Sequence, residues 1–428
     1  MKTRAELFSY AGLDVSADSL RGHYHLDGRP FSEVVTFEGA GPLSTPAVHA
    51  VANLWYLIAG LSYYKAGAAR RIDLGSTPIG PAGRALLEGA LHDGLGEFSY
   101  RNELDLSDVT LEGGIDAERY SPLLDPARVL TPFGGGIDSV VSVTQLSEEI
   151  EQSLFVVSPS SGRFDPLEAT AQATGLDVVR ATRALDPALL AGDDDFMHGH
   201  VPVTAMIALL GVIAAIASQR GGVVMSNEHS SSAPNLRWRG RDINHQWSKS
   251  WTCEGLIGAA LGELVGDEFA VASMLRDRSE LWVARAFAEQ TKFHHVFRSC
   301  NRAFTQRSDT RAANWCGECD KCLFINLILA PFMTRTALRE IFHAEPLSDP
   351  ARLDQLRTLV GVGLDYKPFE CVGDPDESSV ALARVCELAE WRDVAHLEKL
   401  ARLTRPERDF DELLSPQGPS RVPARWLR

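Results

Sequence analysis

The chain lacks both a membrane-length apolar run and a hydrophobic stretch near its first residues. Its longest apolar segment, residues 201–218, is interrupted by Pro202 and followed by Gln219 and Arg220. We therefore expect a buried helix there and not a membrane span. The segment Met1 to Glu6 is charged where a secretory signal would have its apolar core. Nothing in this pattern indicates export, and we expect a cytoplasmic protein.

The chain also has fewer basic than acidic residues. The chain has 42 Lys and Arg residues against 57 Asp and Glu, a formal net charge of −15. Nucleic acids and anionic membranes favour basic faces, so we expect neither as a partner. An anionic small-molecule substrate would need a local basic pocket. The hydrophobic content of 45% and charged content of 23% are ordinary for a soluble globular protein, and 428 residues suffice for two domains and a small appendage.

The seven cysteines do not resemble a secreted disulfide framework, because three of them lie within residues 316–322. Cys316, Cys319 and Cys322 have successive CxxC spacing, and Cys300 lies upstream. Four thiolates would close a tetrahedral Zn²⁺ site and leave no open position for catalysis. A redox CxxC pair and a [4Fe–4S] cluster are the alternatives. We expect the other three cysteines to be core residues: Cys253, Cys371 and Cys386.

The chain divides into three regions by its hydrophobic pattern. Residues 1–125 suggest an N-terminal α+β domain that contributes to substrate binding, with a strand over 32–38 and helices over 45–66 and 86–97. Residues 336–428 favour a helical C-terminal region, in which the Pro- and Arg-rich tail from Arg405 is loosely held.

Between these regions, residues 126–335 alternate between strands and helices. Such alternation predicts an α/β fold with a doubly wound, mostly parallel sheet, and ligands of such sheets sit at the carboxyl ends of the strands. The expected strands are 128–133, 154–158, 178–182 and 222–225, and the expected helices are 139–149, 165–174 and 201–218.

A glycine-rich loop, residues 134–139, lies between the first of these strands and its helix. Glycines let backbone N–H groups face one concavity, and the helix N-terminus adds partial positive charge. Ser139 can donate to a phosphate oxygen, and Asp138 is placed to hold Mg²⁺. The alternative is a plain glycine turn capped by Asp138 and Ser139.

A second polar loop, residues 225–235, follows the fourth strand, and residues 244–250 add further polar groups. Arginine forks suit phosphate and carboxylate oxygens, so this region could form the basic pocket that the acidic chain requires. A solvated loop is the alternative, although it accounts poorly for His, Gln, Trp and Lys in one short segment. The cationic side chains in question are Arg237, Arg239, Arg241 and Lys249.

Histidines cluster around the same loops. His229 and His245 could move protons near neutral pH, with Glu228 behind them. His198 and His200 precede the long helix and could reach the same face. A lone histidine is more often structural than catalytic, so each of these roles is a hypothesis.

The glycine-rich loop resembles the SGGxDS signature of the PP-loop ATP pyrophosphatases, with Gly134 in place of the first serine. It is not a Walker loop, since no Lys-Ser or Lys-Thr pair follows the glycines, and the dinucleotide spacing GxGxxG is absent. The resemblance implies a fold of the PP-loop (adenine nucleotide α-hydrolase-like) type. It also implies cleavage of ATP between the α- and β-phosphates, giving an adenylated substrate and pyrophosphate. In that fold the second strand, which ends near Ser158, lines the adenine.

Four motifs occur here in one order: the glycine loop, Ser-Asn-Glu-His-Ser, Asn-His-Gln-Trp-Ser-Lys-Ser and Cys-Gly-Glu-Cys-Asp-Lys-Cys. With the segment Gly94 to Phe98, this order resembles the UDP-N-acetylmuramoyl-L-alanyl-L-glutamate epimerase family (MurL) over residues 30–330. The resemblance implies ATP- and Mg²⁺-dependent inversion of the terminal L-glutamate of the muramoyl dipeptide, in peptidoglycan precursor synthesis.

The resemblance also implies roles for residues of this sequence. It implies ATP binding by Gly134, Gly135, Gly136, Asp138, Ser139 and Ser158, with Mg²⁺ on Asp138 and zinc on the four clustered cysteines. The catalytic candidates are His229, His245, Glu228 and Lys249, and the substrate-binding candidates are Arg237, Arg239, Arg241, Asn227 and Gln246.

Two alternatives stay open at this point. The cysteine arrangement also resembles the zinc site of 7-cyano-7-deazaguanine synthase, so another PP-loop adenylating enzyme is one of them, although the acidic balance weakens any version that acts on tRNA. A non-catalytic nucleotide-binding or scaffolding protein on the same fold is the other.

Overall fold

A ten-stranded sheet runs through the computed structural model, which describes residues 3–191, 195–304, 312, 314–363 and 367–428. The strand order is β12-β9-β6-β7-β8-β3-β2-β1-β4-β5, and a separate two-stranded ribbon joins β10 to β11. The strands are β1 (Leu7–Val15), β2 (Ser19–Leu26), β3 (Arg29–Glu38), β4 (Arg71–Asp73), β5 (Thr110–Glu112), β6 (Asp125–Pro132), β7 (Glu151–Pro159), β8 (Val178–Ala184), β9 (Arg220–Met225), β10 (Leu236–Trp238), β11 (Arg241–Ile243) and β12 (Ala270–Ser273).

The half of the sheet from β12 to β8 is entirely parallel. Its strands alternate along the chain with α4 (Ile137–Gln145), α5 (Asp165–Thr174), α7 (Val203–Ala217) and α8 (Trp251–Val265). Successive side chains of a strand face opposite sides of the sheet. Phe155 of β7 accordingly joins one hydrophobic core, whereas its neighbours Leu154 and Val156 join a second core on the other face. A strand buried on both faces must be apolar throughout, which explains the unbroken run in β7.

The N-terminal strands extend this same sheet. β1, β2 and β3 form an antiparallel meander, and β3 pairs antiparallel with β8. The carboxylate of Glu33, which is fully buried, accepts hydrogen bonds from the Arg183 guanidinium at 2.5 and 3.1 Å across this junction. The sheet is therefore continuous across residue 125, and the predicted domain division there stays a prediction.

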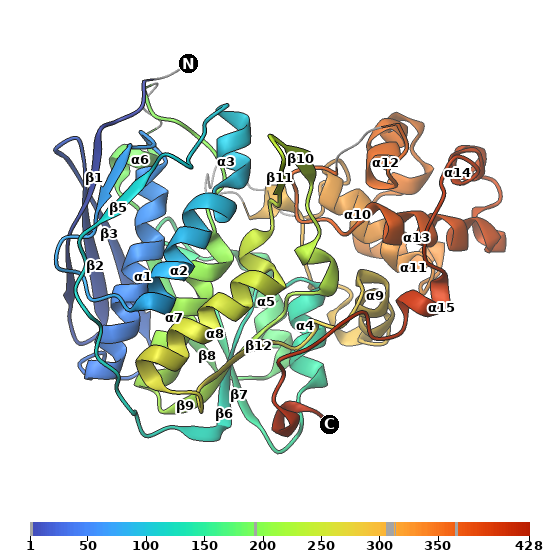
Figure 1. Ribbon diagram of the computed structural model, residues 1–428. Helices are drawn as coiled ribbons and strands as arrows, with labels where there is room; N and C mark the ends of the chain where they lie inside the picture. The colour runs from blue at the N-terminus through green and yellow to red at the C-terminus, as the bar shows by residue number, and fades with distance from the viewer. Residues whose placement is uncertain (1–2, 192–194, 305–311, 313, 364–366) are drawn as a thin grey trace.

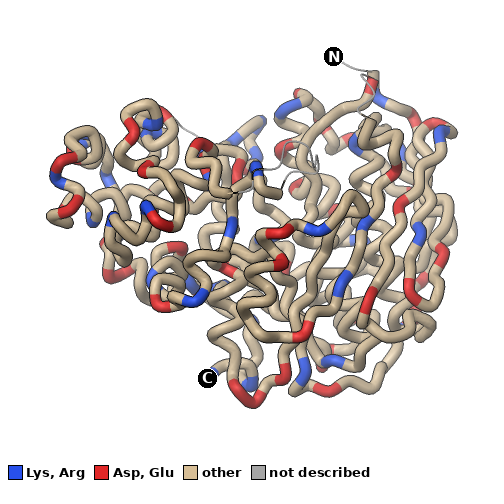
Figure 2. Tube along the Cα trace, turned by 180° about the vertical axis from the view of Figure 1, so that it is seen from behind, with Lys and Arg blue, Asp and Glu red and all other residues tan. Residues whose placement is uncertain are grey.

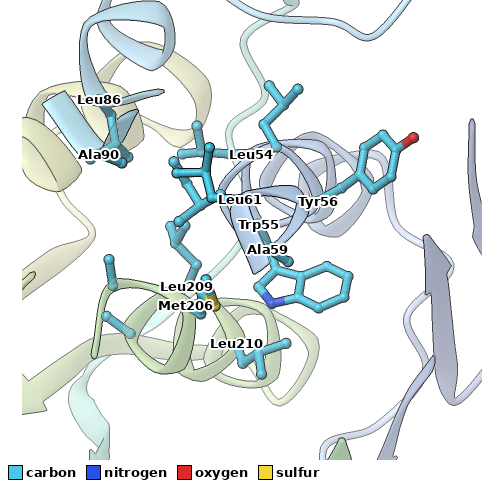
Figure 3. Close-up of a cluster of buried hydrophobic side chains, with 14 of the residues drawn as sticks. Leu54, Trp55, Tyr56, Ala59, Leu61, Leu86, Ala90, Met206, Leu209 and Leu210 are labelled. Carbon is cyan, nitrogen blue, oxygen red and sulfur yellow. The ribbon is translucent and has the colours of Figure 1, made fainter. Parts of the chain in front are cut away.

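Helix α1 (Pro46–Tyr64) packs over the N-terminal half of the sheet. Thr45 caps it by accepting a hydrogen bond from the Val48 N–H at 3.3 Å, and Pro46 occupies its first turn, where a missing N–H costs nothing. The helix is buried on nearly all sides because it lies between the sheet and other helices. Figure 3 shows Leu54 and Trp55 in one cluster with Leu86 of α2 (Pro81–Gly89) and Leu210 of α7.

The C-terminal third is helical and forms the right-hand side of Figure 1, away from the N-terminal strands. These helices share the second hydrophobic core with α4 and β7. They are α9 (Glu280–Ala288), α10 (Asp320–Leu329), α11 (Arg335–Phe342), α12 (Leu353–Leu359), α13 (Pro375–Glu387), α14 (Ala395–Ala401) and α15 (Phe410–Leu413); the remaining α-helices of the described chain are α3 (Gly96–Arg101) and α6 (Pro187–Leu190).

The expectation of a loosely held tail is wrong. The Trp426 side chain is fully buried in a small core with Val129 of β6 and Val224 of β9. The Trp426 carbonyl accepts a hydrogen bond from the Ser147 N–H at 2.9 Å. In Figure 1 the red end of the chain accordingly returns beneath the parallel strands. One large apolar side chain outweighs the polar composition of the segment around it.

The predicted fold class is confirmed as α/β with a large, mostly parallel sheet. Most predicted elements occur, and α5 has the predicted bounds. The helix predicted over 86–97 is instead the end of α2, a π-helical turn over Ala90–Gly94, and the start of α3. The strands that were not predicted are β1, β2, β4, β5, β10, β11 and β12.

Charges of both signs are spread over the described part of the chain. In Figure 2 basic and acidic residues are interspersed along the described trace. Among the described residues, no helix combines the length and apolar character needed to cross a bilayer.

Candidate functional site

The glycine-rich loop joins the carboxyl end of β6 to the N-terminus of α4. Gly135 has φ +73°, a conformation that L side chains rarely adopt, and a Cβ at Gly136 would lie 2.5 Å from the Ser299 Oγ. A Cβ at Gly134 would meet no described atom within 4 Å. The backbone conformation therefore favours glycine at the second position, and a larger residue at the third would displace the Ser299 side chain, whereas the first position has open space.

Asp138 lies in the first turn of α4 with its carboxyl group buried. Its Oδ1 has no hydrogen-bond partner among the residues that the structure describes. Burial and the nearby Glu228 raise the pKa of Asp138 to about 6, although Lys321 and Lys249 act in the opposite direction. A buried carboxylate oxygen without a partner, facing two cations, is suited to hold a divalent ion such as Mg²⁺.

The loop sits where the strand order reverses. The chain runs from β6 outward through β7 and β8, and then returns to the other side of β6 to form β9 and β12. Open α/β sheets bind ligands at such a reversal. The loop after β9, which carries Asn227 and Glu228, therefore meets the glycine loop there. Ser158, the predicted adenine-side residue, is buried at the carboxyl end of β7, while the Ser139 hydroxyl donates to the Gly136 carbonyl at 3.0 Å.

The second polar loop is held by one buried arginine. Arg276 donates hydrogen bonds to the Glu228 carbonyl at 3.1 Å and to the Lys249 carbonyl at 2.6 Å, and it pairs with Glu254 at 3.0 Å. Asn227 and Gln246 are also buried, and the Asn227 N–H donates to the Ser273 Oγ at 2.7 Å. The hydrogen bonds of Arg276 therefore hold the Glu228 and Lys249 segments together.

The three predicted arginines lie on the exposed hairpin β10–β11. Arg241 pairs with Asp93 at 2.9 Å, Arg239 stacks 4.4 Å from the Trp238 ring centre, and Arg237 donates to the Gly240 carbonyl at 3.4 Å. Arg239 and Arg241 line a cavity of about 240 Å³ together with Trp238. The cations that act on Asp138 are instead Lys249 and Lys321, and substrate binding by the arginines stays a prediction.

The predicted histidines occupy two different places. His229 packs beneath the C-terminal tail, where a Cβ at Gly418 would lie 3.2 Å from its Cε1. Burial, Arg408 and Arg276 lower the pKa of His229. His245 belongs to a separate cluster, described next.

A cluster of polar groups surrounds His245. Its Nδ1 hydrogen-bonds to one oxygen of Glu97 in α3, and Arg101 pairs with the other oxygen. The rings of His200 and His245 lie 4.2 Å apart, while His198 is exposed. Burial and the charge of His245 lower the pKa of His200 to about 3, so His200 is neutral beside a charged neighbour.

A segment of the C-terminal region, residues 367–371, closes the site over His245. The Lys367 N–H donates to the Asn235 carbonyl at 3.0 Å, and the Asn235 amide donates to the Pro368 carbonyl at 2.7 Å. The expectation that Cys371 is a core residue is wrong, because this cysteine is only half-buried. Burial raises the pKa of its thiol, but Lys249, His245 and Lys321 lower it to about 5. Cys253, in contrast, is fully buried in the core.

The four predicted metal-ligating cysteines converge. Their sulfur atoms all lie within 4.8 Å of one another, with Cys316–Cys322 at 3.6 Å and Cys319–Cys322 at 3.4 Å. Zn–S bonds of about 2.3 Å in a tetrahedron put sulfur atoms about 3.8 Å apart. The thiols therefore fit a tetrahedral metal. Cys300, which lies upstream of the CxxC motifs, supplies the fourth sulfur atom of this group.

This cysteine cluster touches the glycine loop through the residues before Cys300. The Arg298 N–H donates to the Gly135 carbonyl at 3.1 Å, and the Ser299 hydroxyl fills the space beside Gly136. Lys321, between two of the cysteines, is buried and acts on Asp138. A structural metal here would hold both the loop and a lysine in place.

Sequence reasoning missed Lys321 and Cys371 as site residues. Lys321 stands inside the cysteine motif, where the spacing drew attention to the thiols alone. Cys371 follows Tyr366-Lys367-Pro368-Phe369-Glu370, a polar and aromatic run in a helical region, and only that composition could have drawn attention to it.

Comparisons with known proteins cover nearly the whole chain. One family model, described as the MurL N-terminal domain, matches residues 1–274, and another, described as the MurL C-terminal domain, matches residues 296–412. No solved structure matches the chain.

Three curated proteins named UDP-N-acetyl-alpha-D-muramoyl-L-alanyl-L-glutamate epimerase are similar over almost their full length. The protein of a Micromonospora species is 36% identical, over 99% of this chain and 98% of the relative. That of Salinispora tropica is 37% identical, over 99% and 95% respectively. That of Xanthomonas oryzae pv. oryzae is 35% identical, over 94% and 91%. The chain belongs to the MurL family.

Proposed function

We propose that the chain is an ATP-dependent epimerase that inverts the terminal L-glutamyl residue of UDP-N-acetylmuramoyl-L-alanyl-L-glutamate, in peptidoglycan precursor synthesis. The supporting observation is the glycine loop and the Glu228 loop at the reversal of strand order, with a buried Asp138 whose pKa Glu228 raises and Lys321 and Lys249 lower. That arrangement suits the binding of a nucleoside triphosphate together with Mg²⁺. Curated relatives of nearly equal length bear the name of this epimerase.

The chemistry requires activation of a carboxylate. The α-proton beside a carboxylate is very weakly acidic, because its removal places negative charge next to an existing anion. Transfer of AMP from ATP to the carboxylate removes that charge and releases pyrophosphate. The acyl carbonyl can then accept the electron pair of the Cα–H bond as an enolate. Return of a proton to the opposite face inverts the centre, and hydrolysis releases AMP and the free acid.

On this proposal the glycine loop binds the phosphates. The backbone N–H groups of Gly134 to Gly136 and the N-terminus of α4 face the phosphate oxygens, and the Ser139 hydroxyl can turn from the Gly136 carbonyl to donate to them. Asp138 would hold Mg²⁺, which neutralises charge on the phosphates. Ser158 lies at the end of the next strand, toward the adenine. The strand order 3-2-1-4-5, counted from β6, supports a PP-loop type of fold.

The remaining residues take roles on the substrate side. Lys249 and Lys321 stabilise the charge that develops at the carboxylate under attack, since both face Asp138. Asn227, Gln246 and the hairpin arginines bind polar groups of the muramoyl dipeptide. His229, His245 and Glu228 are the proton-transfer candidates from the sequence. The four cysteines would hold a structural Zn²⁺, which would fix the fold around the loop.

Incubation of the protein with the muramoyl dipeptide, ATP and Mg²⁺ in D₂O tests the proposal. We expect AMP, pyrophosphate, the D-glutamyl epimer and deuterium at its α-position. AMP without deuterium at that position would remove epimerisation and keep carboxylate activation. ATP binding without pyrophosphate release would leave only a nucleotide-binding protein.

A further inference from the structure

A small cavity lies where α3, residues 104–107 and the β10–β11 hairpin meet. Helix α3 contacts β11, and Figure 1 shows the helix beside the hairpin. The volume of the cavity is about 240 Å³, less than the roughly 300–1,000 Å³ of pockets that enclose a whole small ligand. The cavity therefore has room for one end of a larger molecule. Its polar and aromatic lining includes Asp105, Ser107, Trp238, Arg239 and Arg241.

Two guanidinium groups give this cavity positive charge. Arg239 stacks on the ring of Trp238, 4.4 Å from the ring centre, and the stacking holds its planar fork of donors in one place. Arg241 uses Nη2 for hydrogen bonds to the His92 carbonyl at 3.1 Å and to the Asp93 carboxylate at 2.9 Å. Both arginines are exposed, so an anion from solvent can reach them. Two such groups at one cavity suit the oxygens of a phosphate or diphosphate.

A carboxylate in the same cavity narrows the choice of ligand. The Asp105 Oδ1 accepts a hydrogen bond from the Ser107 N–H at 2.9 Å. Hydrogen bonds from Ser107 lower the pKa of Asp105, so this group is charged at neutral pH. A carboxylate is unsuited to a phosphate oxygen, but it accepts hydrogen bonds from hydroxyl groups. A sugar joined to phosphate therefore matches both signs of charge in the cavity.

The indole ring of Trp238 adds an aromatic wall. The Tyr100 ring meets it edge-on, with ring centres 5.8 Å apart and an angle of 85° between the planes. Nucleobases stack on aromatic rings and on the planes of arginine guanidinium groups, and Trp238 with Arg239 offers both surfaces. The small volume favours a pyrimidine over a purine. Base, sugar and phosphate together describe a pyrimidine nucleotide.

The cavity shares its walls with the surroundings of His245. Gly96 and Ile243 line the cavity, and a Cβ at Gly96 would lie 3.5 Å from the Ile243 Cδ1. Glu97, the next residue of α3, bonds to the Nδ1 of His245, which follows β11 by two positions. A long substrate held in the cavity therefore has a proton-transfer candidate on the adjoining part of the same two elements.

We propose that this cavity binds the uridine diphosphate end of the substrate. Trp238 lies against the uracil ring, Asp105 accepts hydrogen bonds from the ribose hydroxyls, and the two arginines bind the diphosphate. The inference rests on the proposed function, which supplies the substrate. The uridine diphosphate takes no part in the reaction, and binding energy from such a remote group can hold the glutamyl end in place for it.

Binding of UDP to the full-length protein tests this site directly. Mg²⁺ and α,β-methylene-ATP, which cannot be cleaved between the α- and β-phosphates, first saturate the glycine loop. We then expect titration calorimetry to show binding of UDP, and weaker binding of ADP because its purine ring is larger than uracil. Arg239→Ala should weaken UDP binding by roughly 10- to 100-fold, the usual loss of a hydrogen bond to a charged group. Arg402→Ala, which removes an arginine that is 74% exposed at the end of α14, is the control and should match wild type.

A truncated substrate separates binding in the cavity from a structural role. N-acetylmuramoyl-L-alanyl-L-glutamate lacks the uridine diphosphate but keeps the residue that reacts. Arg239→Ala should raise the KM for the full substrate by roughly 10- to 100-fold with kcat within about threefold of wild type. With the truncated substrate, the difference between Arg239→Ala and wild type should vanish. Trp238→Ala should behave like Arg239→Ala, whereas Trp238→Phe, which keeps a flat ring, should recover most of the wild-type KM.

Each part of the proposal has a result that would overturn it. Absence of UDP binding to wild type would remove the site, and ADP binding as tight as that of UDP would remove the assignment to uridine. An equal loss by Arg239→Ala on the full and the truncated substrate would show that this arginine acts elsewhere than on the diphosphate. UDP binding by a wild-type protein that forms no epimer would instead overturn the proposed function, while the UDP site would stand.

Discussion

On one side of the candidate site, the polar groups come from six consecutive residues, 134–139; on the other side they come from four separate segments. The first side, which we call the phosphate side, is made of backbone, one helix N-terminus and Asp138. The second, the proton side, joins Glu97, His200, His245 and Cys371, which lie up to 274 positions apart in the sequence. Backbone geometry can be encoded locally, whereas a tuned pair of side-chain charges needs neighbours that only the fold supplies.

The two sides also differ in how neighbouring charges shift the pKa values of their groups. On the phosphate side, burial and a neighbouring carboxylate raise the pKa of Asp138, and two lysines act against them. On the proton side, opposite charges support each other, and the pKa values of Cys371 and His245 move apart. Pairs of groups whose environments push their pKa values apart are typical of acid–base sites. Four predictions separate the two sides.

The largest effect is expected at Asp138. Asp138→Asn keeps the side-chain volume but removes the charge that would hold Mg²⁺. Pyrophosphate release should fall by roughly 10²–10³-fold, the size seen when one group that stabilises developing charge is lost. Asp165→Asn, an exposed carboxylate in the first turn of α5, is the matched control and should act like wild type. Equal activity of the two variants would remove Asp138 from the chemistry.

The next effect concerns the cysteine cluster. Cys300→Ser should lower the bound zinc, measured by elemental analysis, from about one equivalent per chain toward zero. Because the Arg298 to Cys300 segment packs on the glycine loop, pyrophosphate release should fall as well. The melting temperature should drop by roughly 5 °C or more, as loss of a few kcal/mol predicts. Cys386→Ser controls for loss of a thiol. Iron in place of zinc would indicate a cluster, and no metal at all would contradict the site.

A smaller and selective effect is expected at Asn235. Asn235→Ala removes the group that fixes both the His245 backbone and the Pro368 carbonyl. We expect α-deuterium incorporation to fall by roughly 10- to 100-fold, as a small misplacement of a reacting group does. Pyrophosphate release should change by less than about threefold. A parallel loss of both activities would mean that the two sides are not separable.

The smallest effects are expected within the glycine loop. Gly136→Ala places a Cβ against the Ser299 hydroxyl, so the KM for ATP should rise by roughly tenfold, because the loop must shift away from the phosphates. Gly134→Ser has open space for its side chain and adds a hydroxyl donor, so the KM should stay equal or fall by a few-fold. Steady-state kinetics of pyrophosphate release measure both. A rise in the KM for ATP of Gly134→Ser would show that this protein needs glycine at the first position of the loop.

Much of the phosphate side could be predicted from the sequence. A strand, three glycines, Asp138, Ser139 and a helix follow one another within residues 125–145, and local backbone preferences suffice to place them. Three of the four cysteines were equally predictable, because CxxC spacing brings thiols together within a short segment. Cys300 lies 16 positions before Cys316, and the fold brings it to the others. The π-helical turn before α3, in contrast, has no period that a sequence pattern could show, and it brings Glu97 to the site.

The proton side could be predicted only in part. His245 was noticed for its residue type, but its partner Glu97 lies 148 positions away. Cys371 was expected to be a core residue, since a lone cysteine in a helical region is usually apolar in its surroundings. The pairing of β3 with β8, which unites the N-terminal strands with the parallel sheet, likewise joins residues far apart in the sequence, and Glu33 and Arg183 bond across it over 150 positions.

The sequence by itself determined the parallel α/β architecture, the glycine-rich loop between a strand and a helix, and the grouping of Cys316, Cys319 and Cys322, because each depends on residues close together in the chain. Tertiary structure alone decided which lysines act on Asp138, which carboxylate orients His245, and that Cys371 and His245 shift each other's pKa. The physical reason is range: hydrogen-bonding patterns of turns and helices act over a few residues, whereas burial and Coulomb interactions act between whatever groups the fold brings within a few ångströms.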